Sequence, residues 1–160
     1  MAKTCKLCWA LFGLTLVGVA AMAAMVFIKG NTTVSDDGRS AIHMNASERD
    51  LVLAEMRGFL EGVEGILDAV VGDDMAAVSA TARKVGMGNV EGVPVSLMAK
   101  LPLEFKSLGM ATHTAFDDLA VEAEDMGDRE VVLQKLGSLL GNCTSCHAGY
   151  RIDIGVAVDG

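Results

Sequence analysis

The stretch "DREVVLQKLGSLLGNCTSCHAGYR", from Asp128 to Arg151, decides how the chain folds. Apolar side chains recur in it every three or four residues, which predicts one face of an α-helix. The face consists of Val132, Leu136, Leu139, Cys143, Cys146 and Tyr150. Asp128 follows Gly127 and stands where an N-cap is expected. The stretch therefore predicts an amphipathic helix with two cysteines on its inward side.

Three more helical patterns precede this one. The first begins at Ser47, which we take as its N-cap, and ends at Gly72. The second covers residues 73–85, and the third covers 102–126 after a loop that contains Pro94. The inward stripe of the first consists of Val52, Met56, Phe59, Val63, Ile66 and Val70. Four amphipathic helices with mostly short connections predict an all-α fold, an antiparallel four-helix bundle over residues 46–151.

The N-terminal region predicts a membrane anchor. Residues 7–28 hold no charged side chain, and 22 helical residues span about 33 Å, enough to cross the apolar core of a bilayer. Lys3 and Lys6 precede the span, so the positive-inside rule puts the N-terminus in the cytoplasm and the rest of the chain outside. Residues 1–30 are thus expected to form the anchor.

A cleaved signal peptide is the alternative interpretation of the same residues. "AMA" at Ala21–Ala23 resembles a cleavage site, although the apolar run continues to Ile28 beyond it. Both interpretations export the remainder of the chain. The expected location is the periplasmic side of a bacterial inner membrane, with a single span.

The exported part is acidic and has irregular ends. After residue 30 the chain has a net charge of −11, which argues against nucleic-acid binding and suits a basic protein partner. The acidic residues of 117–130 are the expected docking region for such a partner.

Two segments predict irregular structure. Residues 31–45 predict a polar tether without structure, and residues 152–160 predict a loose tail despite the alternation of Ile152 and Ile154.

The two cysteines and the histidine that follows them point to a cofactor. Cys143 and Cys146 lie three residues apart, on one helix face, and His147 lies one turn after Cys143. This spacing lets two thiols join the two vinyl groups of a haem while the imidazole reaches the iron. We therefore expect one covalently bound haem c. A redox dithiol of the thioredoxin kind would require a βαβ setting, which the pattern does not offer.

A zinc site is the other rival, because "CKLC" at Cys5–Cys8 is a second CxxC. Cys5 lies on the cytoplasmic side of the predicted span and Cys8 lies within it, so a membrane separates them from Cys143 and Cys146. No histidine follows "CKLC", so it does not predict a second haem. Incidental thiols, lipidation or a cytoplasmic metal site remain alternatives for this pair.

The ending "CTSCHAGYR" resembles the CxxCHxxYR ending of the class II c-type cytochromes, the cytochrome c′ family. The resemblance extends over roughly residues 46–151 and leaves out the anchor, tether and tail. It implies a four-helix bundle with haem on the last helix, and it places Tyr150 and Arg151 beside the haem. It also implies that the first helix faces the other side of the iron, and that dimers form in some members.

What fills the sixth position of the iron decides the function. Low-spin members of the family carry a methionine in the first helix, commonly before a basic residue, and Met56 precedes Arg57 here. We expect Met56 as the second axial ligand and Phe59 as part of the haem wall, which together favour an electron carrier. His113 is an alternative ligand, and an open iron that binds nitric oxide or carbon monoxide is the alternative function. No arrangement of nucleophile and base suggests an enzyme.

Overall fold

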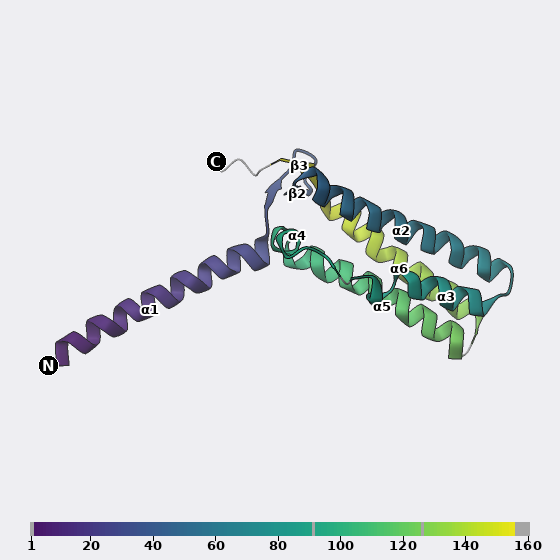
Figure 1. Cartoon of the computed structure of the whole chain (residues 1–160), viewed down its shortest axis with the longest axis horizontal. Coiled ribbons are helices and arrows are strands. Elements are labelled where there is room, and N and C mark those ends of the chain that lie inside the picture. The colour runs from purple at the N-terminus through teal and green to yellow at the C-terminus, as the bar shows by residue number, and fades with distance from the viewer. Residues whose placement is uncertain (1, 91, 126, 156–160) are drawn as a thin grey trace.

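The computed structural model describes residues 2–90, 92–125 and 127–155, and the side chains of residues 2–5 and 26 lie outside that description. Most of the described chain is helical, as expected, with six α-helices, two short helical turns and a small sheet. The first helix, α1 (Ala2–Ala24), continues into the π-helical turn η1 (Met25–Lys29) and projects away from the other elements (Figure 1). Residues 6–29 are long and apolar enough to cross a membrane.

Four helices surround the larger apolar core. They are α2 (Ala46–Val71), α3 (Met75–Val85), α5 (Leu103–Asp125) and α6 (Arg129–Gly149). All four contribute fully buried side chains, among them Ile66, Val78, Phe116 and Leu139. The predicted stripes therefore face inward because burying their apolar area stabilises the packed helices.

Two glycines let α2 and α3 approach closely. A Cβ atom at Gly62 would lie 2.9 Å from Val85 Cγ2, and one at Gly65 would lie 3.1 Å from Thr81 Cγ2. Real Cβ atoms do not tolerate the first distance. Because glycine has no side chain at these two positions, α2 and α3 pack directly against each other. This contact lies in the half of α2 that is far from the sheet.

The expected tether is wrong, because residues 31–45 contain a hairpin. Strands β1 (Thr32–Val34) and β2 (Ser40–Met44) pair antiparallel, and Gly38 takes a left-handed φ of 82° in the turn between them. Burial explains the order of this segment, since Ala41, Ile42 and Met44 are at most 1 % exposed. Ile42 and Met44 form a second apolar core with Val52, Leu97 and Leu101.

The expectation of a loose tail is also wrong for the residues that the structure describes. Strand β3 (Tyr150–Ile154) pairs parallel with β2, with Ser40 opposite Tyr150 and Met44 opposite Ile154. The alternation of Ile152 and Ile154 thus belongs to a real strand whose partner lies more than 100 residues earlier in the chain. Residues 156–160 of the tail lie outside the described residues.

Helix boundaries agree with the sequence except at two places. The N-cap of α2 is Asn45 and not Ser47, because Asn45 Oδ1 accepts from the Glu48 amide at 2.9 Å while Glu48 Oε2 accepts from the Asn45 amide at 3.0 Å. The predicted loop around Pro94 contains the turn η2 (Met87–Val90) and the helix α4 (Val95–Lys100). Asp128 caps α6 as predicted.

Gly30 joins the N-terminal helical segment to the hairpin in a conformation that requires glycine. Its φ is 64°, and a Cβ atom there would meet the backbone of Lys100, Leu101 and Pro102. The next amide, of Asn31, donates to the Lys100 carbonyl at 2.8 Å. The anchor therefore leaves the body at a fixed point, beside α4 and the start of α5.

Glu48 provides a test of how this end of the molecule is held. It is 5 % exposed, and its carboxylate accepts from Lys100 Nζ at 2.6 and 2.9 Å besides completing the cap of α2. The Lys100 ammonium and then the Asn45 amide hold the pKa of Glu48 below its usual 4.5. Stability from this group is therefore present above about pH 4.5 and is lost as pH falls through the folded pKa.

We expect Glu48→Gln to lower the free energy of unfolding by about 1–3 kcal/mol at pH 7, because it removes the charge that Lys100 and the helix N-terminus face. The difference between variant and wild type should shrink as the pH falls below 4.5. Urea unfolding at pH 7 and pH 3 measures both. A constant difference at the two pH values would contradict the assigned role.

Candidate functional site

The last two turns of α6 carry the cysteines and the histidine of the motif. Cys143 and Cys146 are half-buried free thiols, and His147 is exposed. The helix ends at Tyr150, whose amide donates to the Cys146 carbonyl. Burial raises the pKa of both thiols above 9.0, so they are protonated at neutral pH. Two neutral thiols and an imidazole thus share one end of one helix.

A cavity of about 450 Å³ lies in front of this helix end, between α2, α5 and α6. Its volume falls in the range of about 300–1,000 Å³ that is usual for small-molecule and cofactor sites. Cys143, Cys146 and His147 line it from α6, and Met56 and Phe59 line it from α2. The remaining walls are mainly apolar and include Leu60, Val63, Leu108 and Leu140. The structure therefore brings the predicted methionine and the predicted motif into one cavity.

A smaller cavity of about 260 Å³ has Met56, Cys146 and His147 in its walls as well. Three arginines line it, Arg39 from the hairpin turn, Arg49 from α2 and Arg151 from β3. Their positive charge favours an anionic group at this edge of the site. The two cavities share residues and together present an apolar interior with a cationic rim.

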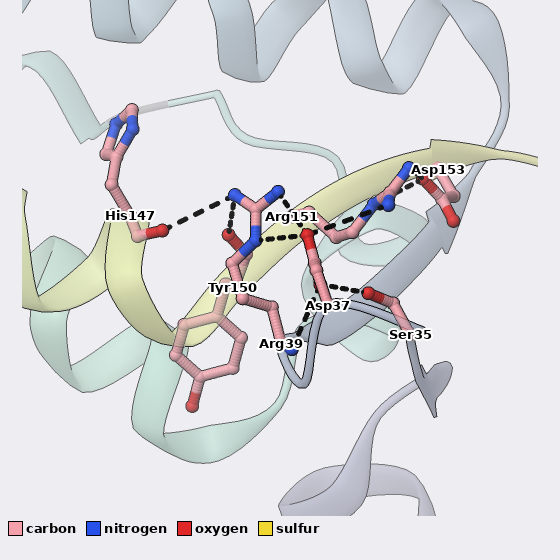
Figure 2. Close-up of polar contacts among 7 residues, drawn as sticks. All are labelled: Ser35, Asp37, Arg39, His147, Tyr150, Arg151 and Asp153. Carbon is pink, nitrogen blue, oxygen red and sulfur yellow. Dashed lines mark hydrogen bonds and ion pairs between the residues drawn. The ribbon is translucent and has the colours of Figure 1, made fainter.

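Arg39 is the functional residue that the sequence interpretation missed. Its Nη1 donates to the carbonyls of His147 and Tyr150, each at 3.4 Å, and so ties the turn between β1 and β2 to the end of α6 (Figure 2). Asp37 holds the same guanidinium through Nε at 2.8 Å and Nη2 at 2.6 Å. Arg39, and then the Ser35 hydroxyl, lower the pKa of Asp37 strongly.

Tyr150 and Arg151 begin β3 and flank the site in different ways. The Tyr150 hydroxyl donates to Glu104 Oε2 at 3.1 Å, and its ring meets Phe105 edge to face at 5.4 Å. Burial and the Glu104 carboxylate raise its pKa above 10. Arg151 is exposed and pairs with Asp153, its Nη2 lying 2.8 Å from Asp153 Oδ1 (Figure 2). Both residues line the arginine-rich cavity.

His113 is buried, and both its ring nitrogens have partners. Nδ1 donates to the Val85 carbonyl at 2.8 Å, and Nε2 lies 3.1 Å from Glu55 Oε1. Burial lowers its pKa, but the Glu55 carboxylate and the Val85 carbonyl outweigh this and raise it above 6.5. Its ring lies against Phe59, with 4.8 Å between the centroids, and it is absent from the lining of the 450 Å³ cavity. This placement does not favour His113 as a ligand in that cavity.

Other predicted features lie away from the site. The acidic segment 117–130 covers the C-terminal part of α5 and the start of α6, and the 18 helical steps from Arg129 to His147 correspond to about 27 Å. Glu124 binds Arg83, which lowers its pKa to about 2. Cys8 lies on α1, far from the body (Figure 1), and the side chain of Cys5 lies outside the described residues.

Comparison with protein-family models, with curated proteins and with solved structures finds no match for this chain. The interpretation of the site therefore rests on its own residues and their arrangement.

We expect Arg39→Ala to loosen the end of α6. Loss of the two carbonyl contacts should lower the free energy of unfolding by about 0.5–1.5 kcal/mol and speed hydrogen exchange at the Tyr150 amide. Arg49→Ala is the matched control, since Arg49 lines the same cavity but pairs with its neighbour Asp50 at 2.6 Å. Equal exchange rates in the two variants would contradict a tie between the hairpin turn and the helix end.

Proposed function

We propose that this protein is a membrane-anchored monohaem c-type cytochrome that carries electrons outside the cytoplasm. The observation that supports it is the single cavity lined by Cys143, Cys146 and His147 from α6 and by Met56 from α2. Two thiols and an imidazole at this spacing suit covalent haem attachment, and a thioether from the facing helix suits a second ligand to the iron.

The residues present fit a haem. Attachment would add the S–H of each thiol across one vinyl C=C, forming an S–C bond and placing the hydrogen on the neighbouring carbon. Cys143 and Cys146 would supply these thiols, because both are free. Apolar walls suit the macrocycle, and the arginines of the adjoining cavity suit its two carboxylates.

His147 from α6 and Met56 from α2 would be the residues that hold the iron. The imidazole is exposed at the end of α6, and Met56 is half-buried on the inward side of α2. An imidazole and a thioether together raise the reduction potential and leave no open position for a gas, which suits electron transfer. Phe59 lines the same cavity as Met56 and stacks on Phe116, with 5.6 Å between the ring centroids, so it supports the apolar wall on this side of the cavity.

The arrangement of α2, α3, α5 and α6 supports the class II cytochrome interpretation. In this proposal the four helices form the four-helix bundle of the cytochrome c′ family, and the hairpin, β3 and α4 are additions at the haem end. The family's dimers are not part of the proposal.

The cellular setting follows from α1. We propose that it stays uncleaved, crosses the bacterial inner membrane once and holds the haem domain in the periplasm. A redox partner protein would then dock at the end that carries His147, where the haem is proposed, since the start of α6 at Arg129 lies about 27 Å from it along the helix. That segment serves long-range attraction of a basic partner in this proposal and not the contact itself.

A gas-binding protein is the second candidate. The walls formed by Phe59, Leu60 and Val63 are apolar, so a displaced Met56 would leave a pocket for nitric oxide or carbon monoxide beside the iron. The two candidates differ in whether the thioether is bound.

Covalent attachment is tested by replacing both cysteines. We expect the wild-type chain, purified from membranes, to retain haem on denaturing gels. Cys143→Ala with Cys146→Ala should lose that signal completely, because no thioether forms. Cys8→Ala is the control and should retain the full signal. Haem staining that survives the double substitution would refute the assignment.

Met56→Ala distinguishes the electron carrier from the gas-binding protein. We expect the wild type to be low-spin and inert to carbon monoxide, and the variant to become high-spin, to bind carbon monoxide and to have a lower potential. Met98→Ala is the matched control, since Met98 is also half-buried but does not line the cavity. A wild type that is already high-spin and binds carbon monoxide would favour the gas-binding function.

A further inference from the structure

A separate cavity of about 390 Å³ lies on the other side of Phe105 from the arginine-rich cavity. It is enclosed by α2, α4, α5 and the segment between η2 and α4. Leu97, Leu101 and Met98 contribute to its mainly apolar walls. None of the motif residues lines it, so it is distinct from the proposed haem site.

Two helix glycines line this cavity at positions where no neighbouring atom would exclude a side chain. A Cβ atom at Gly58 or at Gly109 would meet no atom within 4 Å, in contrast to Gly62 and Gly65, which contact α3. Glycine inside a helix is less favourable than alanine. At these two positions, which line the cavity, glycine leaves open the space that a larger side chain would occupy.

One polar pair stands in the cavity wall. Glu55 Oε1 lies 3.1 Å from Nε2 of the buried His113, which is anchored by the Val85 carbonyl. Oε2 of Glu55 makes no hydrogen bond to another residue of the described chain. The wall thus offers one fixed acceptor, with a carboxylate charge, to a ligand that brings a donor.

The cavity lies between the anchor and the proposed haem. It shares Val52, Glu55, Phe105 and Gly109 with the 450 Å³ cavity. On the other side, Lys106 Nζ donates to the Phe27 carbonyl in η1 at 3.1 Å. A ligand bound here would lie within one side chain of the haem cavity and next to the point where the chain enters the membrane.

We propose that this cavity binds a lipophilic hydroquinone, with a ring hydroxyl donating to Glu55. The membrane end favours a lipid-soluble ligand, and the free carboxylate oxygen favours a neutral hydroxyl over an anionic head such as that of a fatty acid. The preference for a redox-active ligand rests on the proposed function, because the neighbouring cavity would hold the electron acceptor.

Binding is measured on the full chain in detergent by equilibrium dialysis. The probe is a benzohydroquinone with a ten-carbon alkyl chain, and ascorbate keeps protein and probe reduced, so that no electron transfer alters the ligand. Two comparison compounds are its dimethyl ether, which lacks both hydroxyl donors, and decanoate. We expect the hydroquinone to bind at least about tenfold more tightly than either.

Gly58 lines this cavity and not the 450 Å³ cavity, so Gly58→Leu should fill the former and weaken hydroquinone binding by at least about tenfold. Gly58→Ala, which disturbs the helix less, should give a smaller loss in the same direction. Gly137→Leu, at an exposed glycine of α6 outside all three cavities, should bind like wild type. Unchanged binding in both Gly58 variants, or equal binding of the dimethyl ether or decanoate, would overturn the proposal.

The two proposals fail in different ways. Absence of haem from the wild-type chain on denaturing gels would defeat the cytochrome function and leave the dialysis result readable. Haem with a low-spin spectrum but without hydroquinone binding would defeat this inference alone.

Discussion

The parallel pairing of β2 with β3 is the constraint on which the site depends. β2 leads through the Asn45 cap directly into α2, and β3 follows α6 without a loop. Pairing the two strands therefore fixes the start of α2 next to the end of α6. Met56 comes three turns into α2, and His147 comes in the last turn of α6, so both lie within reach of one cavity. Arg39 strengthens the same junction by binding the carbonyls of His147 and Tyr150.

Glycines divide α2 into a packed half and an open half. At Gly62 and Gly65 the missing side chains allow contact with α3, and the core around Ile66 and Val70 is closed. At Met56 and Gly58 the helix instead borders two cavities. Side chains in a closed core are held by packing density, whereas those around a cavity remain able to accept a ligand. The open half is also the half next to the sheet and the anchor (Figure 1).

The sequence predicted the helices well because their apolar stripes follow the helical period. The inward residues Val52, Ile66 and Val70 are buried, and Asp128 caps α6. It also placed Met56 beside the motif, but only through the family resemblance. The hairpin was missed although Asp37–Gly38, between short runs with Thr, Val and Ile, is a strong turn signal. Local polarity favoured a tether, and the partner strand β3 lies too far along the chain for any local pattern to reveal it.

The cavities and Arg39 were beyond the sequence for a related reason. A cavity is enclosed by residues from three or four elements. The spacing of residues within one element therefore does not predict it. Arg39 reaches the His147 carbonyl only because the turn that carries it lies at the end of α6. The pairing of β2 with β3 places the turn there. Gly58 could have been noticed as a helix glycine, but only the absence of a neighbour within 4 Å separates it from Gly62.

The N-terminal helix joins the rest of the molecule at the same end as the proposed haem site. Gly30 and Asn31 hold the end of η1 next to Lys100, and the hairpin that begins at Thr32 leads to the sheet and so to the end of α6. The anchor, the arginines and the proposed haem therefore share one end of the molecule, while the acidic segment 117–130 lies at the other (Figure 1). In the proposed function, the hairpin would keep the distance between membrane and haem shorter and less variable than a flexible tether would. Because electron transfer depends on such distances, the proposal favours a donor in the membrane over one that diffuses to the far end.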